Sequence, residues 1–488
     1  MSQVSLAPRT PVIIGVGQIS VPTPDLSSPA DPISLMTEAT RAALGDTGGA
    51  RMASSVDLVG VVGGAFSYSD PGMLVANSAG LGEVATVLTT WGGHTPVAFL
   101  GELAERIRTG AIDVAVMVGG ENNATRRAVR AAGGTVPRWP EAKDARAPSW
   151  GAPLEMGNAI DSERGGELPR NNYAILDSAI RARRGETLDE ARNRAAHLWA
   201  GFASVAASNP HAADRSAMSP PEIREPGPTN RMVSWPYTKA MCANNQVDYA
   251  GAVVVASTEA AERLGVPIDR RIYPHDLVIA ADTDSLLPRA ELHHVPALAE
   301  AGAHIKKAWG DMDTITHLDL YGCFPSIVTH TCELFGIPND RQLTVTGGLG
   351  FMGAPLNFAA GQSLIAMVEI LRADPGTIGM VQGNGGHAAK HAFGIYSTKP
   401  TPTKPPSPPI VHGPATTPAE PQRAGEVTID GVTVEYSHVG PERAIAICRF
   451  DDGSRLWANS TDTSVMDSFV SVECVGRRGE VSDGSLRL

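Results

Sequence analysis

Short apolar runs alternate with amphipathic stretches over residues 1–398 of the chain. A first set of buried runs and helical patterns covers residues 12–16, 32–44, 58–62, 98–109 and 113–119. A second set of the same kind covers residues 277–280, 317–321, 355–371 and 377–381. Continuous apolar strands that alternate with helices are typical of a sheet covered on both faces. The pattern therefore predicts an α/β fold for this part of the chain.

The two sets resemble each other. In each, a glycine cluster precedes a proline near the first turn of a helix, and that helix leads to a buried strand ending in glycines. The first copy begins at residues 92–96 (GGHTP) and the second at residues 350–355 (GFMGAP). The repetition predicts an internal duplication of one layered unit. Residues 121–235, between the copies, lack this alternation of apolar runs and helical patterns. A long insertion of this kind usually serves binding.

Proline marks the end of this region. Nine of the 37 prolines fall between Pro400 and Pro421, which favours an extended linker over residues 399–421. Beyond it the apolar residues alternate with period two in the runs 426–436, 443–450, 454–458 and 468–475. Residues 422–488 are therefore predicted to form a small all-β domain, resembling the oligonucleotide/oligosaccharide-binding (OB) barrel.

Composition narrows the possible functions. A hydrophobic share of 42% supports sizeable cores, and a net charge of −12 excludes a global positive field that would attract nucleic acid or an acidic membrane. The five cysteines form no Cys-x-x-Cys pair, so we expect no disulfide framework and no bound metal. Residues 1–11 have no secretory pattern, and no run reaches the roughly 18 apolar residues that span a membrane. We therefore expect a cytoplasmic protein without a membrane partner.

Two further segments carry a family resemblance. The runs 244–252 (NNQVDYAGA) and 347–355 (GGLGFMGAP), in this order and spacing, resemble those of the thiolase superfamily. The motifs GGHTP, YGCFPS and GNGGHAAKHA are most similar to those of its thiolase-like members, of the acetyl-CoA acetyltransferase type. The resemblance implies two βαβαβ-type halves, 1–120 and 236–398, in an αβαβα layered arrangement with residues 121–235 as a loop domain. It also implies coenzyme A or acyl-CoA as a ligand, with no permanently bound cofactor.

The positions that carry thiolase chemistry differ in this chain. The family's nucleophilic cysteine corresponds to Gly93, its activating histidine to Ala354, and its second cysteine to Gly383. The residue that holds the thioester oxygen corresponds to Tyr321. Covalent catalysis needs a nucleophile beside a base. The resemblance therefore implies an acyl-CoA-binding protein without ordinary thiolase activity.

Three residues are candidates for remaining chemistry. His94 precedes a predicted helix and could act as a base or donate to a thioester oxygen, or it could simply bond to backbone in a glycine turn. Tyr321 could donate a hydrogen bond to an acyl oxygen. His391 has a suitable spacing for the cleft, although lone histidines are more often structural.

Other residues are candidates for ligand binding. The glycines around Asn384 could form an anion-binding nest or only a turn. Cys323 would need a lowered pKa to be reactive, and free cysteines are usually buried and inert. Arginines of the insertion could meet the phosphates of coenzyme A, or could be a solvated helix face. The predicted binding residues are Asn244, Cys323, Gly353, Asn384, Gly385, Arg126 and Arg184.

Two functions remain open from the sequence. The first is acyl-CoA binding with altered acyl transfer through His94, Tyr321 and His391, where two helix N-termini at 93–96 and 353–355 face one pocket. The second is a non-catalytic CoA-ester carrier, or a scaffold whose C-terminal β-domain binds a protein partner. Nucleic-acid binding is disfavoured because residues 422–488 lack an aromatic and basic stripe.

Overall fold

The computed structural model describes residues 7–153, 156–400 and 407–488. A six-stranded sheet is formed, in spatial order, by β1 (Pro11–Ser20), β8 (Asp248–Ser257), β4 (Val114–Asn122), β2 (Leu58–Val61), β3 (Ala85–Thr89) and β5 (Ser149–Trp150). β2, β3 and β4 are parallel, whereas β8 is antiparallel to both of its neighbours. Nearly every residue of β1, β4 and β8 is buried, as expected for a sheet covered on both faces.

A five-stranded sheet repeats this arrangement. Its strands, in spatial order, are β10 (His317–Asp319), β11 (Ile378–Gly385), β12 (Lys390–Ser397), β9 (Tyr273–Ala281) and β13 (Ile410–Val411). The order β9-β12-β11-β10 matches β1-β8-β4-β2 of the first sheet. The predicted duplication is therefore confirmed.

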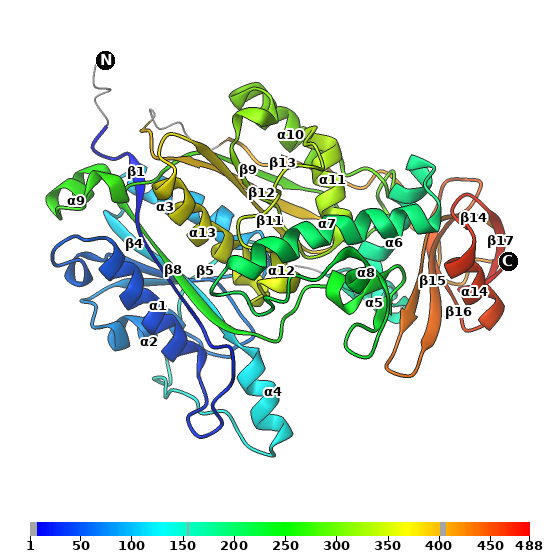
Figure 1. Cartoon of the computed structure of the whole chain (residues 1–488), viewed down its shortest axis with the longest axis horizontal. Coiled ribbons are helices and arrows are strands. Elements are labelled where there is room, and N and C mark those ends of the chain that lie inside the picture. The colour runs from blue at the N-terminus through cyan, green and yellow to red at the C-terminus, as the bar shows by residue number, and fades with distance from the viewer. Residues whose placement is uncertain (1–6, 154–155, 401–406) are drawn as a thin grey trace.

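Helices complete five layers (Figure 1). Two lie between the sheets, α3 (Thr95–Arg108) and α13 (Ala359–Ala373). The first sheet is covered outside by α1 (Pro32–Asp46) and α2 (Pro71–Ala79), and the second by α10 (Pro296–Trp309) and α11 (Pro325–Phe335). α1 begins where the sequence predicts, because the Asp31 carboxylate accepts a hydrogen bond from the amide of Ile33 at 2.8 Å and Pro32 fits the first turn.

The insertion is more regular than the sequence pattern suggests. It contains the helices α4 (Asn123–Ala131), α5 (Ala159–Arg164), α6 (Pro169–Arg184), α7 (Leu188–Ser208) and α8 (Pro220–Arg224). The expected loss of period over residues 121–235 is thus wrong. α7 begins with a capping box in which Thr187 and Glu190 bond each other's backbone amides. Its buried face consists mostly of alanines, whose weak hydrophobicity conceals the helical period.

The C-terminal residues form a closed five-stranded barrel, as predicted. The strands β14 (Gly425–Tyr436), β15 (Pro441–Arg449), β16 (Arg455–Ser460), β18 (Ser485–Arg487) and β17 (Arg478–Ser482) pair in this order, and β17 pairs again with β14. The predicted strand at 468–475 is wrong, because α14 (Thr463–Ser471) occupies its first half and the rest is a bend and turn. The Asp462 side chain starts this helix by accepting a hydrogen bond from the amide of Ser464 at 2.8 Å.

The barrel is joined to the insertion. β6 (Met232–Ser234), which also pairs with β7 (Tyr237–Thr238), adds to the edge of β14 through Ser234 and Glu435. Ile445, Ile447 and Trp457 of the barrel belong to the same buried apolar cluster as the two halves. Figure 1 shows α6 lying between the barrel and the rest of the molecule.

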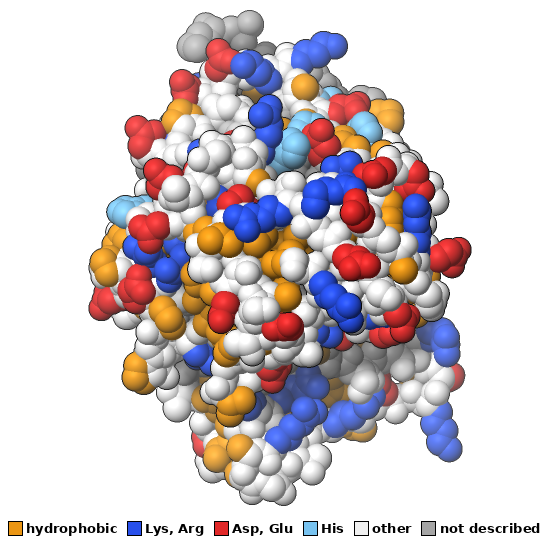
Figure 2. Space-filling view, turned by 90° about the vertical axis from the view of Figure 1, so that its right-hand side faces the viewer, with side chains coloured by type: hydrophobic (Ala, Val, Ile, Leu, Met, Phe, Trp, Pro, Cys, Tyr) orange, Lys and Arg blue, Asp and Glu red, His pale blue; other side chains and the backbone are white. Residues whose placement is uncertain are grey.

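The proline-rich segment is bound where the structure describes it. β13 extends the second sheet by pairing with β9, and the amide of Ala419 donates to the carbonyl of Arg455 at 2.7 Å. Part of the predicted linker, residues 401–406, lies outside the described residues. The barrel end of the molecule carries acidic and basic side chains interspersed with apolar ones (Figure 2). No helix among the described residues is long and apolar enough to cross a membrane.

Short helical elements complete the description. They are η1 (Ala53–Ser55), η2 (Lys239–Met241), α9 (Thr258–Arg263), η3 (Ile268–Arg270), η4 (Met312–Thr314), α12 (Gly348–Phe351) and η5 (Leu356–Phe358).

Candidate functional site

A cavity of about 470 Å³ lies where the two halves meet the insertion. Its floor comes from both copies of the duplicated unit, and one wall is the first turn of α6. The floor includes the predicted positions Gly93, Tyr321, Cys323, Ala354, Asn384 and Gly385. The structure therefore brings these six positions together at one cavity.

Gly93 and Tyr321 meet at this floor. Gly93 lies just before α3, whose first turn contains Pro96. A Cβ added at Gly93 would be 2.1 Å from the hydroxyl oxygen of Tyr321 and 2.4 Å from the carbonyl oxygen of Asn384. The Tyr321 hydroxyl thus occupies the space into which a side chain at position 93 would project. Burial raises the pKa of Tyr321 far above its usual value, so at neutral pH its hydroxyl is a neutral hydrogen-bond donor.

Asn384 is held by a tyrosine that sequence reasoning missed. The Asn384 amide nitrogen donates to the hydroxyl oxygen of Tyr173 at 2.7 Å, and the amide of Ala388 donates to the same oxygen at 3.0 Å. The Tyr173 hydroxyl in turn donates to the carbonyl of Gly386 at 3.2 Å. Tyr173 lies on α6, within the insertion, where no motif singled it out. The buried pattern of α6 was the available signal.

The cysteines near the cavity are protonated thiols. Burial raises the pKa of Cys323 to about 12. Burial likewise raises the pKa of Cys242, which also lines the cavity, to about 12. Because the thiolate is the reactive form, neither residue is a nucleophile at neutral pH.

The two candidate histidines lie behind the cavity floor. His94 is not among the residues that line the cavity, and a Cβ on Gly385 would be 2.6 Å from its Nδ1 atom. Burial, with a smaller effect of Lys390, lowers the pKa of His94 to about 4. His391 is fully buried directly across the β11–β12 pair from Asn384, and burial lowers its pKa to about 3. Both imidazoles are therefore neutral at pH 7.

The expected second helix N-terminus at 353–355 is wrong. Gly353 has a φ of 96°, a turn conformation, and a 3-10 turn over residues 356–358 separates it from the start of α13 at Ala359. The glycines and the proline of residues 350–355 resemble those of the first copy. The chain nevertheless makes one more turn, at residues 356–358, before α13 begins. Ala354 still lines the cavity.

The remaining predicted residues lie off the cavity. A Cβ at Gly383 would be 2.8 Å from the Cα atom of His94, so this position is crowded. Asn244 accepts a hydrogen bond from the amide of Gln246, and Asn245 lines the cavity instead. The Arg126 guanidinium donates to the carbonyl of Ala65 at 2.8 Å.

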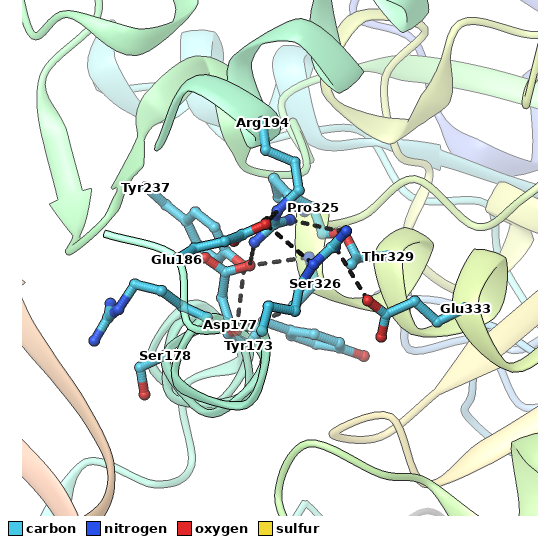
Figure 3. A network of polar contacts seen from close by, with 12 residues as sticks. Tyr173, Asp177, Ser178, Glu186, Arg194, Tyr237, Pro325, Ser326, Thr329 and Glu333 are labelled. Carbon is cyan, nitrogen blue, oxygen red and sulfur yellow. Dashed lines mark hydrogen bonds and ion pairs between the residues drawn. The ribbon is translucent and has the colours of Figure 1, made fainter. Parts of the chain in front are cut away.

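Arg184 belongs to a polar network that anchors α6. Figure 3 shows Glu186, Glu333 and Tyr173 of this network. The Arg184 guanidinium contacts the carboxylates of Glu186 at 3.0 Å and Glu333 at 3.1 Å. In the same network the carbonyl of Tyr173 accepts hydrogen bonds from the Tyr237 hydroxyl at 3.2 Å and the Ser326 hydroxyl at 2.9 Å. The network fixes Tyr173, and through it Asn384.

No group of His, Cys, Asp and Glu side chains in the described parts of the chain is arranged to hold a metal ion. The donors on the cavity floor are instead hydroxyl and amide groups, whereas the Arg170 guanidinium belongs to one wall. Such a floor suits an uncharged carbonyl oxygen and apolar atoms.

Comparisons with known proteins agree with the fold. A family model described as the additional C-terminal domain of thiolase-like protein type 1 matches residues 406–485. A monomeric SCP2-thiolase-like protein type 1 from Mycobacterium smegmatis is 28% identical, with 98% of each chain covered and a TM-score of 0.82. None of the curated proteins matches the chain.

Two more distant structures share the fold. The Ltp2–ChsH2(DUF35) aldolase is 19% identical, with 80% of this chain and 99% of that chain covered and a TM-score of 0.61. The dimeric peroxisomal thiolase of Saccharomyces cerevisiae is 13% identical, with 80% and 98% covered and a TM-score of 0.56. The layered halves are therefore those of the thiolase fold.

Proposed function

We propose that this chain, which resembles thiolase-like proteins with an additional C-terminal domain, binds an acyl-CoA thioester without forming a cysteine acyl-enzyme. The thioester group would lie on the floor of the cavity. The apolar wall, which includes Leu168, Val233 and Phe324, would contact the uncharged arm of the ligand.

Donors for the thioester carbonyl oxygen support this proposal. The Tyr321 hydroxyl faces the cavity, and no hydrogen bond to it is found among the described residues. The backbone amides of Gly93 and His94, at the positive end of α3, also lack an acceptor within the described parts of the chain. Amides at a helix N-terminus favour a partly negative oxygen. A carbonyl oxygen at this point would accept hydrogen bonds from the Tyr321 hydroxyl on one side and from the two amides on the other.

The position of Tyr321 is the observation that carries the proposal. Because its hydroxyl fills the space beside Gly93, the chain has exchanged the place of a nucleophile for a neutral donor. The nearby thiols are protonated and the imidazoles of His94 and His391 are neutral and off the cavity. These groups can hold a thioester but supply no activated nucleophile.

Binding and turnover are measured separately to test this. Titration calorimetry with acetyl-CoA should give saturable binding with a Kd on the order of micromolar to millimolar, because few polar contacts exceed the cost of association. Cleavage of acetoacetyl-CoA in the presence of coenzyme A should stay below about 1 per second. No saturable binding at millimolar acetyl-CoA contradicts the binding proposal and favours a scaffold role. Faster cleavage contradicts the loss of thiolase activity.

A further inference from the structure

We infer that Glu435 of the C-terminal barrel positions Arg170, a residue of the cavity wall, to receive the phosphate groups of a CoA thioester. The inference rests on the proposed function and assigns the charged end of the same ligand. Arg170 lies in the first turn of α6 and lines the cavity. Its side chain is 37% exposed, so its guanidinium is accessible from the cavity mouth.

Glu435 is a buried anion between two guanidinium groups. One carboxylate oxygen accepts from Arg170 at 2.8 Å and the other from Arg443 at 2.7 Å. Burial by itself would raise the pKa of Glu435, but the hydrogen bonds from Arg443 and Arg170 lower it below the usual value. The carboxylate is therefore ionised at neutral pH. Two cations share one anion, which leaves one positive charge beside the cavity in a chain of net charge −12.

The barrel also fixes the rest of α6. The Ser178 hydroxyl accepts from the amide of Val432 at 2.9 Å, and Arg181 donates to both carboxylate oxygens of Glu473 at 2.8 and 2.9 Å. These contacts attach the middle and the end of the helix to the barrel, whereas Glu435 attaches its first turn. The direction of the Arg170 side chain is thus set by residues of the barrel rather than by the two halves.

The chemistry of Arg170 identifies what it receives. A guanidinium binds phosphate by paired, charge-assisted hydrogen bonds, which an uncharged pantetheine arm cannot accept in the same way. The floor of the cavity, with Tyr321 and Asn384, presents neutral donors. The site therefore separates into a neutral inner part for the thioester and a positive mouth for the phosphates.

Titrations of the full chain with two ligands test this. Acetyl-CoA carries the phosphates, and S-acetylpantetheine carries the same thioester without them. Arg170→Gln should weaken acetyl-CoA about tenfold or more, as expected for loss of a charge-assisted hydrogen bond, and should change S-acetylpantetheine by less than about twofold. Glu435→Asp keeps the charge but withdraws the carboxylate, so it should weaken acetyl-CoA about threefold or more and spare the shorter ligand.

Arg478→Gln is the matched control, because Arg478 pairs with Glu426 at 2.9 Å and Asp451 at 2.7 Å within the barrel and does not line the cavity. It should change neither affinity. If a cavity variant does not fold, wild-type titrations decide: added NaCl should weaken acetyl-CoA but not S-acetylpantetheine.

Several results would overturn the inference. Equal losses of affinity for acetyl-CoA and S-acetylpantetheine in Arg170→Gln would indicate a general structural defect. An unchanged affinity in Glu435→Asp would remove the role of the barrel. Wild-type protein that binds both ligands equally would leave the proposed function standing and overturn the assignment of the phosphates. Wild-type protein that binds neither would overturn both.

Discussion

The hydroxyl oxygen of Tyr321 lies where a side chain on residue 93 would begin, 2.1 Å from the position of an added Cβ. The two residues belong to opposite halves of the duplicated fold, Gly93 before α3 and Tyr321 after β10. A glycine at one position therefore accommodates a large side chain at the other. The space beside Gly93 is therefore filled by a packed, neutral hydroxyl.

Gly93→Ala should destabilise the protein. The added methyl group would collide with the Tyr321 hydroxyl and with the carbonyl oxygen of Asn384. Overpacking of this kind costs about 1–3 kcal/mol in the free energy of unfolding, measured by urea denaturation. Gly82→Ala is the control, since a Cβ there meets no atom within 4 Å. Equal stability of Gly93→Ala and wild type would contradict the described position of Tyr321.

Tyr321→Phe should weaken acetyl-CoA binding and leave the fold unchanged. The hydroxyl has no hydrogen-bond partner among the described residues, so its removal breaks no internal bond, whereas a bound carbonyl loses a donor. We expect an affinity loss of about fivefold, corresponding to roughly 1 kcal/mol for a neutral hydrogen bond, measured by calorimetry. Tyr396→Phe, at a buried tyrosine outside the cavity lining, should bind as wild type. An unaltered Kd for Tyr321→Phe would exclude Tyr321 as the donor.

Acid should destabilise the wild-type protein relative to His330→Phe. His330 is fully buried on α11, and burial lowers its pKa to about 3. The unfolded chain binds a proton at this histidine below about pH 6.5, whereas the folded chain stays neutral until far lower pH. Stability contributed by the neutral form is thus complete above pH 6.5 and is lost on acidification.

The measurement is the difference in unfolding free energy between wild type and His330→Phe. From about pH 7.5 to about pH 5 it should shift by about 2 kcal/mol in favour of the variant, at about 1.4 kcal/mol per pH unit below 6.5. Comparison of the two proteins cancels the other titrating groups, including Glu121, whose pKa burial raises to about 7 and which acts in the opposite direction. A difference that does not change with pH would contradict this expectation.

A chain that ends at residue 398 should not fold cooperatively. It would lose Ile445, Ile447 and Trp457 from the shared apolar cluster and expose the face of α6 that the barrel covers. Size-exclusion chromatography should show aggregation, and thermal unfolding should lose its sharp transition. A soluble truncated chain with a cooperative transition near that of the full chain would contradict this and support independent domains.

The sequence predicted part of the two halves, including β1, α1, β2, α3 and β4, because their apolar periods are strong and their caps are local, as at Asp31 and Pro32. Gly93, Tyr321 and Asn384, which the sequence singled out, lie together at one cavity. The sequence did not predict β3, β8, β12, α2, α10 and α11. Nor did it predict α7, whose alanine-rich face has little hydrophobic contrast. Residues 468–475 alternate like a strand, but the Asp462 cap starts a helix that extends to Ser471.

The parts of the site that were missed depend on distant contacts. Tyr173 reaches Asn384 only because α6 is anchored to α11 and to the barrel, through bonds such as those of Ser326 and Ser178. Side chains brought together in this way leave no spacing in the sequence. The proposed link between Arg170 and Glu435 is of the same kind, since these residues lie in different domains of the predicted division.

The packing of β14 on α6, which includes the contact of Glu435 with Arg170, also has a consequence for biosynthesis. On the ribosome, α6 emerges long before the strand that covers it, because β14 is among the last segments to be translated. The nascent chain therefore carries the barrel-facing side of α6 uncovered while residues 185–424 are translated, a form that chaperones recognise. The wall that α6 contributes to the cavity is therefore fixed by the barrel only after translation has nearly ended.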